Sequence, residues 1–231
     1  MPNILIVDTA TRSASLALGG ARAFTQRLSD PEERNSRDLL VLVQSLFEPI
    51  GGLAAADLDA LAYNAGPGSY TGSRIAASVV QGIAFAKGLP AIAVNTFELL
   101  RLRAQIEADI TSGTACMTVV ESKVDEYFWC LFNDAPLSQQ RPAMCLGKAA
   151  DLREAVGLFK GPVVVNQAVK SHPVASDLDG VLWMQPLASD AFELVEERLA
   201  VGETQTAFEV EPLYGQDNIG WLTLAEQRAR A

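Results

Sequence analysis

The segment that most constrains the fold of this chain is the run from Ile75 to Ala86, which contains no charged side chain. Cap signals at Thr71 and Lys87 predict a helix over about 71–87. At about 100° per residue, its apolar side chains point to every side of the axis. A helix of this kind must be buried all round, and one sheet covers only one side.

A second helix, predicted over about 36–49, also carries more apolar surface than one core needs. Its apolar side chains cover an arc of roughly 160°, wider than the ~100° stripe of an ordinary surface helix. The surplus faces of the two helices predict an intermolecular helix bundle, unless the C-terminal half of the chain covers them. The predicted partner contacts are Leu39, Leu42, Leu46, Ile75, Ala76, Val79 and Ile83.

Charge and hydropathy exclude several classes of partner. The chain has 18 Lys and Arg against 28 Asp and Glu, a formal net charge of -10. This balance disfavours direct binding to nucleic acid or to an anionic membrane. The N-terminus lacks the basic region of a signal peptide, and no apolar run reaches the ~18 residues of a membrane span. We therefore expect a cytoplasmic protein without a membrane partner.

Histidine and cysteine usage narrows the chemistry. His172 is the only histidine, so a metal site of the His-x-x-x-His type cannot form, and no Gly-x-Ser-x-Gly elbow of a serine hydrolase is present. Cys116, Cys130 and Cys145 are widely spaced and form no Cys-x-x-Cys pair, which is typical of reduced, buried thiols. We predict no metal ligands and disfavour serine-hydrolase chemistry.

The order of the predicted elements indicates an α/β fold in two parts. In the first part, strands at 4–9, 14–18, 22–28, 59–65 and 90–95 alternate with the helices at 36–49, 71–87 and 96–108. The second part has strands at 115–121, 126–132, near 143 and at 162–165, with helices at 147–157 and 188–201. The polar stretch 109–113 marks the predicted boundary, which gives domains 1–108 and 109–231.

The junction from Gly66 to Arg74, between a strand and a helix, is the one segment that suggests a ligand. Backbone N–H groups at a helix N-terminus can hold an anion. The residues that such a site would use, with the first hairpin turn, are Asp8, Thr9, Gly66, Gly68, Ser69, Thr71, Gly72 and Arg74. The spacing matches neither a Walker loop nor a Rossmann fingerprint. A capped turn that aims the helix, with an Asx turn at Asp8, explains the same residues.

Four blocks of this sequence carry a resemblance to a known family. They are residues 6–11 around Asp8-Thr9-Ala10-Thr11, residues 65–75 around Gly66 to Arg74, Gln81-Gly82-Ile-Ala, and Glu211-Pro212-Leu-Tyr214. These residues resemble the TsaB (YeaZ) family, most closely over 1–100. The resemblance implies the actin-like (ASKHA, ribonuclease H-like) α/β fold in two lobes. Whether the last segment returns to the first lobe stays open.

The family resemblance also implies a function. Members of the TsaB (YeaZ) family are non-catalytic scaffold or activator subunits, in effect pseudoenzymes, in the formation of N6-threonylcarbamoyladenosine in tRNA. They pair through first-lobe helices with a catalytic paralogue, TsaD, which holds metal through a His-x-x-x-His motif, and they work with the ATPase TsaE. Alone they form homodimers through the same surface, and they reach tRNA only indirectly. No cofactor is expected on this chain alone, while ATP and Mg²⁺ belong to the complex.

Departures from the family pattern leave alternatives open. Asn35-Ser36 replaces His-Ser, Glu121-Ser122-Lys123 replaces an Asp-Ala-Arg turn, and Asn166-Gln167 replaces a glycine-rich turn. Gly215-Gln216 replaces an aliphatic-Arg pair. These departures argue against an assignment of nucleotide binding to the second lobe, and they put its contacts in doubt. The competing function is an actin-like ATPase or kinase that acts on Mg-ATP through Asp8 and the 66–72 turn. A glycoprotease-like peptidase is disfavoured because metal ligands are missing.

Overall fold

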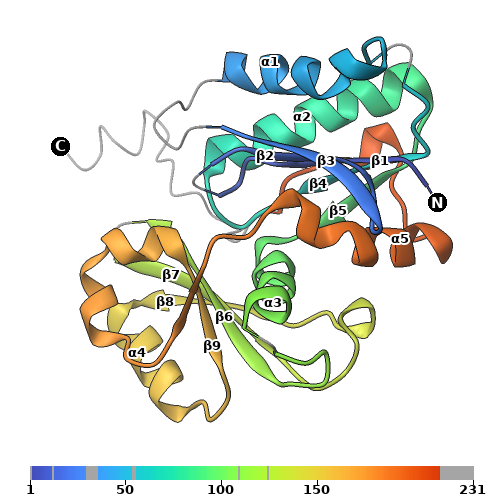
Figure 1. Ribbon diagram of the computed structural model, residues 1–231. Coiled ribbons are helices and arrows are strands. Elements are labelled where there is room, and N and C mark those ends of the chain that lie inside the picture. The colour runs from blue at the N-terminus through green and yellow to red at the C-terminus, as the bar shows by residue number, and fades with distance from the viewer. Residues whose placement is uncertain are drawn as a thin grey trace, which may run out of the picture.

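A computed structural model describes residues 2–11, 13–29, 36–53, 56–108, 110–123 and 125–213 (Figure 1). Over this part of the chain, two five-stranded sheets form, with strand orders β3-β2-β1-β4-β5 and β10-β9-β6-β7-β8. Each sheet with its helices is one lobe. This is the predicted α/β fold in two lobes. Asn35, Asp109, Tyr214, Gly215 and Gln216, which were singled out above, lie outside the described residues.

The first sheet is built around its central strand. The antiparallel meander comprises β1 (Ile4–Asp8), β2 (Ser15–Gly20) and β3 (Ala23–Leu28). β4 (Ala60–Asn64) pairs in parallel with β1, and β5 (Ala91–Val94) pairs in parallel with β4. All residues of β1 and β4 are buried, because both faces of the sheet are covered.

Helices cover the two faces of the first sheet. α1 (Ser36–Phe47) and α2 (Tyr70–Lys87) lie on one side, and α5 (Phe192–Ala200) lies on the other (Figure 1). α1 is followed by the short helix η1 (Glu48–Ile50). The core beneath α1 and α2 includes Val43 and Val80, and the core beneath α5 includes Ile92 and Val195. Helix α5 thus comes from the far end of the described chain to complete the first lobe.

The second sheet repeats this layered plan. Its strands are β6 (Cys116–Lys123), β7 (Glu126–Phe132), β8 (Met144–Lys148), β9 (Val163–Asn166) and β10 (Leu182–Met184). α4 (Ala149–Leu158) packs with one face, and α3 (Thr96–Glu107) packs with the other. The short helices are η2 (Leu137–Gln139), η3 (Gln167–Ser171), η4 (Pro173–Asp177), η5 (Ala188–Ala191) and η6 (Ala207–Glu209).

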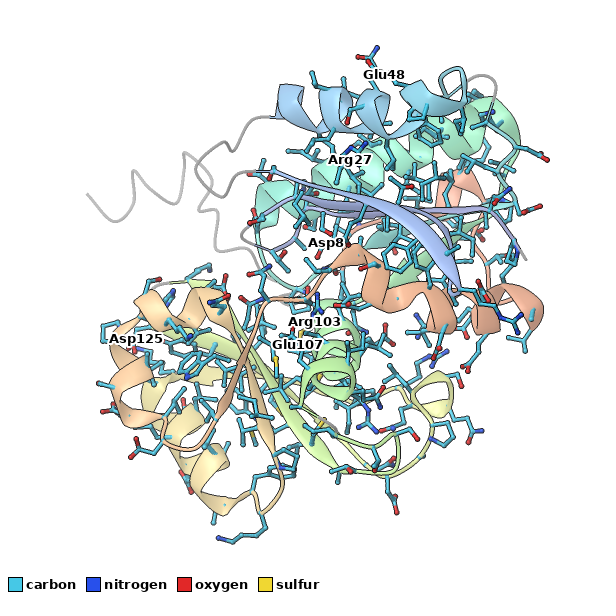
Figure 2. All side chains as sticks on the ribbon, in the orientation of Figure 1. Asp8, Arg27, Glu48, Arg103, Glu107 and Asp125 are labelled. Atoms are coloured by element: carbon cyan, nitrogen blue, oxygen red, sulfur yellow. The ribbon has the colours of Figure 1, made fainter. Side chains whose placement is uncertain are left out.

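Helix α3 lies between the lobes and is held by two buried ion pairs. Glu98 Oε1 is 2.6 Å from Arg198 Nη2 of α5, and Arg103 Nε is 3.1 Å from Asp190 Oδ2 of η5. Figure 2 shows Arg103 on α3 in the region between the two sheets. Since α3 also contributes Leu100 to the core of the second lobe, these pairs connect the two lobes.

Within the described residues, no helix is long and apolar enough to cross a membrane.

Candidate functional site

The turn between β4 and α2 is shaped by glycines and a helix cap. Gly66 and Gly68 have φ values of +107° and +151°, a backbone region that favours glycine. The peptide bond between Gly66 and Pro67 is cis. Ser69 is the N-cap of α2, and its hydroxyl accepts a hydrogen bond from Gly72 N at 3.1 Å. The turn therefore sets the direction in which α2 leaves the sheet.

This turn packs against the β1–β2 turn, backbone to backbone. Ser69 N donates to Ala10 O at 2.7 Å, and Thr9 Oγ1 donates to Gly72 O at 2.6 Å. A Cβ atom added to Gly68 or Gly72 would overlap the carbonyl oxygen of Ala10 or Thr9. The contact leaves no room for an anion between the two turns.

Asp8, at the end of β1, is completely buried and uses its carboxylate within the protein. Oδ1 accepts from Ala10 N at 2.9 Å and from Asn64 Nδ2 at 3.0 Å, and Oδ2 accepts from Thr11 Oγ1 at 3.3 Å. Desolvation by burial raises the pKa of Asp8 from 3.8 to about 6, although these hydrogen bonds oppose the rise. The bond to Ala10 N is that of an Asx turn.

A buried polar network continues from Asp8 to the glycine turn. Asn64 Oδ1 accepts from Gly66 N at 2.9 Å, and Thr96 Oγ1 donates to Pro67 O at 2.5 Å. The groups proposed for an anion at Asp8, Thr9, Gly66, Ser69 and Gly72 are thus engaged with one another. This arrangement favours the capped turn over anion binding.

Thr71 and Arg74, also in the proposed anion set, belong to a different feature. The guanidinium carbon of Arg74 lies 3.3 Å from the centre of the Tyr70 ring. Both Thr71 and Arg74 line an open groove of about 420 Å³ between α1 and α2. Leu40 and Tyr70, which also line it, are 59% and 51% exposed. The remaining lining residues are Ile75, Ser78 and Val79. We call this feature the α1–α2 groove.

The structure divides the predicted partner contacts into two groups. Leu39, Leu46 and Ala76 are only 3%, 2% and 0% exposed, because they face the first sheet and pack in its core. Their assignment as partner contacts is therefore corrected. The other four are partly buried at the margin of the same core, namely Leu42, Ile75, Val79 and Ile83. For these four the assignment stays a prediction, and Ile75 and Val79 line the α1–α2 groove.

Sequence reasoning missed a pair of exposed aromatic side chains beside α2. Phe85 and Phe208 are 68% and 82% exposed, and their rings meet edge to face with centroids 5.8 Å apart. Phe208 lies in η6, which is attached to α2 by a hydrogen bond from Gln81 Nε2 to Ala207 O at 2.9 Å. The all-round apolar pattern of the helix indicated that Phe85 is available for a contact, but no local pattern predicted that Phe208 lies next to it.

Metal-binding residues are not gathered anywhere in the described ranges. His172 lies in the second lobe, where Nδ1 is 3.3 Å from the hydroxyl of Tyr127. No group of three or more His, Cys, Asp or Glu side chains in those ranges has an arrangement that could hold a metal ion. Because the sequence has a single histidine, the His-x-x-x-His motif that the family resemblance associates with TsaD cannot form in this chain.

Comparisons with known proteins agree along nearly the whole chain. The family model for TsaD, tRNA N6-adenosine threonylcarbamoyltransferase, matches residues 31–127. The tRNA threonylcarbamoyladenosine biosynthesis protein TsaB of Escherichia coli K12 is 26% identical over 96% of this chain and 97% of its own. The TsaB protein of Haemophilus influenzae is 24% identical over 96% of each chain.

The solved structures add agreement in three dimensions. The structure of YeaZ from Pseudomonas aeruginosa superposes with a TM-score of 0.75 at 26% identity, over 93% of this chain and all of that one. The sequence matches and the structural superposition both extend over the two lobes, including α1 and α2. The chain is thus similar to TsaB (YeaZ) proteins in sequence and in fold over nearly its whole length.

Proposed function

We propose that this protein is a non-catalytic subunit in the biosynthesis of tRNA threonylcarbamoyladenosine. It scaffolds a TsaD-like catalytic paralogue by pairing through α1 and α2, and it works with a TsaE-like ATPase. The names of the TsaB relatives support the pathway. The observation that carries the pairing is the open, apolar α1–α2 groove on the first lobe. A role in tRNA modification also supports a cytoplasmic location.

The side chains around the groove are suited to a protein partner. Tyr and Arg are enriched among residues that dominate binding energy, and Tyr70 and Arg74 stack at the rim of this groove. Burial of a few hundred Å² of apolar surface contributes several kcal/mol at about 25 cal/mol per Å². The exposed pair of Phe85 and Phe208 extends the apolar surface beside α2.

The family model supports a partner of related fold. It describes the transferase, yet it matches residues 31–127 of this chain, a range that includes both α1 and α2. Transferase relatives therefore carry helices of related sequence in the same place. Two such chains can present equivalent helix pairs to each other about an approximate twofold axis. The same geometry supports a homodimer when the paralogue is absent.

The turns around Asp8 support a role without catalysis. A carboxylate that positions Mg-ATP must reach its ligand, whereas Asp8 is completely buried and accepts its hydrogen bonds from the protein. An actin-like ATPase or kinase is therefore the less supported function. ATP binding by the purified chain at micromolar Kd, lost in Asp8→Asn, would favour that alternative.

Light scattering of mixtures with the catalytic paralogue tests the proposal. Leu40→Asp and Val79→Asp should each abolish association, because a partner would bury an unpaired charge at a cost of several kcal/mol. Leu158→Asp is the matched control, since Leu158 is an exposed leucine on α4 of the second lobe. Leu46→Asp is unsuitable, because Leu46 is in the core.

Two results would contradict the proposal. One is association that persists in both groove variants while their circular dichroism matches the parent protein. The other is threonylcarbamoyl transfer to tRNA by this chain without the paralogue. Association lost in the groove variants and retained in Leu158→Asp is the expected outcome.

A further inference from the structure

Two clusters of side chains lie on the same face of α2, near opposite ends of the helix. Near the N-terminus, Arg74 stacks on the Tyr70 ring at 3.3 Å, and its Nη1 donates to Tyr70 O at 3.3 Å. Near the C-terminus, Phe85 meets Phe208 of η6 edge to face. Arg74 and Phe85 are about three turns and about 16 Å apart along the helix, so they project in nearly the same direction.

The two ends of this face differ in charge. Within α2 the charged side chains are Arg74 and Lys87. Lys87 Nζ donates to O of the buried Ala56 at 3.1 Å, so this cation is directed toward the core side. Arg74 adds positive charge to the N-terminal end, where the helix dipole is also positive. At the other end, η6 carries the exposed carboxylate of Glu209 beside the aromatic pair.

Antiparallel pairing of α2 with α2 of a second copy brings these unlike ends together. A twofold axis across the middle of α2 places the N-terminal end of each helix beside the C-terminal end of the other. Arg74 of each copy then meets the aromatic pair of the other, and a cation over an aromatic ring is attracted to it. Parallel pairing would instead bring both Arg74 side chains and both positive helix ends to one end of the contact.

The area that a stable dimer needs also favours a contribution from the aromatic pair. A stable interface buries about 800 Å² on each partner, from roughly 20–30 residues. The α1–α2 groove has seven lining residues, which are too few. Phe85 and Phe208 are 68% and 82% exposed, and together they offer about 300 Å² more, since a buried phenylalanine contributes roughly 150–250 Å².

We propose that two copies of this chain pair through antiparallel α2 helices, with Phe85 and Phe208 of each copy packed on the Tyr70–Arg74 stack of the other. The pairing surface therefore includes η6 as well as α1 and α2, and Phe208 sets the affinity of the homodimer. The inference rests on the proposed function, because it specifies the homodimer that forms through this surface when the paralogue is absent.

A double-mutant cycle on the dimer affinity of the full chain tests this contact. Within one copy, Arg74 is about 16 Å along α2 from the aromatic pair, so energetic coupling between Arg74 and Phe208 arises only between copies. Arg74→Ala and Phe208→Ala should each raise the dimer Kd about tenfold, as the loss of an interface anchor does. The double variant should also raise it about tenfold, because both changes remove the same contact.

Leu158→Ala is the matched control, since Leu158 is an exposed apolar residue on α4 of the second lobe. It should leave the dimer Kd unchanged in sedimentation velocity, both alone and combined with Arg74→Ala. A double variant Arg74→Ala/Phe208→Ala whose Kd rises about a hundredfold would overturn the contact, because independent sites multiply their effects. An unchanged Kd in Phe208→Ala would overturn it as well.

Cross-linking tests the direction of the helices without removing a contact residue. Cys145 is replaced by serine, and Thr71→Cys and Ala86→Cys, both at exposed positions of α2, are made in separate proteins. In the antiparallel pair, Thr71 of one copy lies beside Ala86 of the other, whereas the two Thr71 positions are about 22 Å apart. A short bismaleimide that spans less than this distance should link the mixed proteins and neither protein alone. Links within each protein alone would overturn the antiparallel arrangement.

Binding to the catalytic paralogue separates this inference from the proposed function. A chain that stays monomeric in sedimentation velocity overturns the inference, while light scattering with the paralogue still decides the proposed function. Conversely, a coupled double-mutant cycle together with no binding to the paralogue would support the antiparallel homodimer and contradict the proposed function.

Discussion

Replacement of Gly72 by alanine tests the close contact between the two turns at the start of α2. Gly72 is buried in the first turn of that helix. A Cβ atom there would overlap the carbonyl oxygen of Thr9 and lie 2.8 Å from its carbonyl carbon, where ordinary contact begins at 3.4 Å. The Thr9 side chain, which donates to Gly72 O at 2.6 Å, would have to move with its backbone.

The expected loss of stability follows from these contacts. Overpacking costs about 1–3 kcal/mol, and loss of the hydrogen bond costs about 1 kcal/mol. The higher helix propensity of alanine returns at most about 1 kcal/mol. The net loss of about 2 kcal/mol should lower the Tm of a chain of this length by roughly 4–8 °C.

Gly82 is the matched control, since it is an exposed glycine later in the same helix and an added Cβ would meet no atom within 4 Å. Gly82→Ala should raise the Tm by roughly 2–4 °C, because only the helix propensity changes. Thermal unfolding followed by far-UV circular dichroism measures both variants. If Gly72→Ala unfolds at or above the parental Tm, the β1–β2 turn and the start of α2 do not pack as closely as described, and the close contact between Gly72 and the Thr9 carbonyl oxygen is refuted.

Two further predictions concern buried charge. Arg198→Ala leaves the Glu98 carboxylate buried without its counter-ion and should lower the free energy of unfolding by about 3–5 kcal/mol. Arg141→Ala, in an exposed pair with Glu203, should lower it by at most about 1 kcal/mol, and equal losses in urea unfolding would contradict the difference in burial. Burial raises the pKa of Asp8 to about 6, so the folded protein binds a proton at this carboxyl more tightly than the unfolded chain does. The stability that the bound proton contributes is present below about pH 4 and is lost as the pH rises from about 4 to 6. Asp8→Asn should therefore be more stable than the parent at neutral pH by up to about 3 kcal/mol, and the gain should shrink below about pH 4. A pH-independent difference in urea unfolding would refute this assignment.

Local signals were sufficient to predict most of the elements. The helix predicted over 71–87 spans 70–87, and that predicted over 36–49 spans 36–47 with a short helix after it. Caps and periodicity depend on neighbouring residues, so a single sequence contains them. The short strand β10 was missed, because three residues carry too little pattern.

The orientation of the helices was less accessible. A helix that is apolar on all sides has no preferred face in its sequence, and Ala76 was therefore assigned to a partner when it packs against the sheet. Contacts between residues far apart in the sequence determined the features that local patterns did not predict. The choice between an anion site and a capped turn depended on Ala10 and Ser69, which are distant in sequence and bonded in the structure.

The late position of α5 has a consequence for how the protein is made. The face of the first sheet that carries Ile4 and Ile92 is closed by Phe192 and Val195, so it stays bare until the ribosome has synthesised almost the entire chain. The core of the second lobe draws only on residues 97–184 and can consolidate earlier. We expect the usual order, in which N-terminal parts mature first, to be reversed here. A nascent chain arrested before α5 would expose the apolar face of the first sheet, and we expect it to need chaperones to stay free of aggregation.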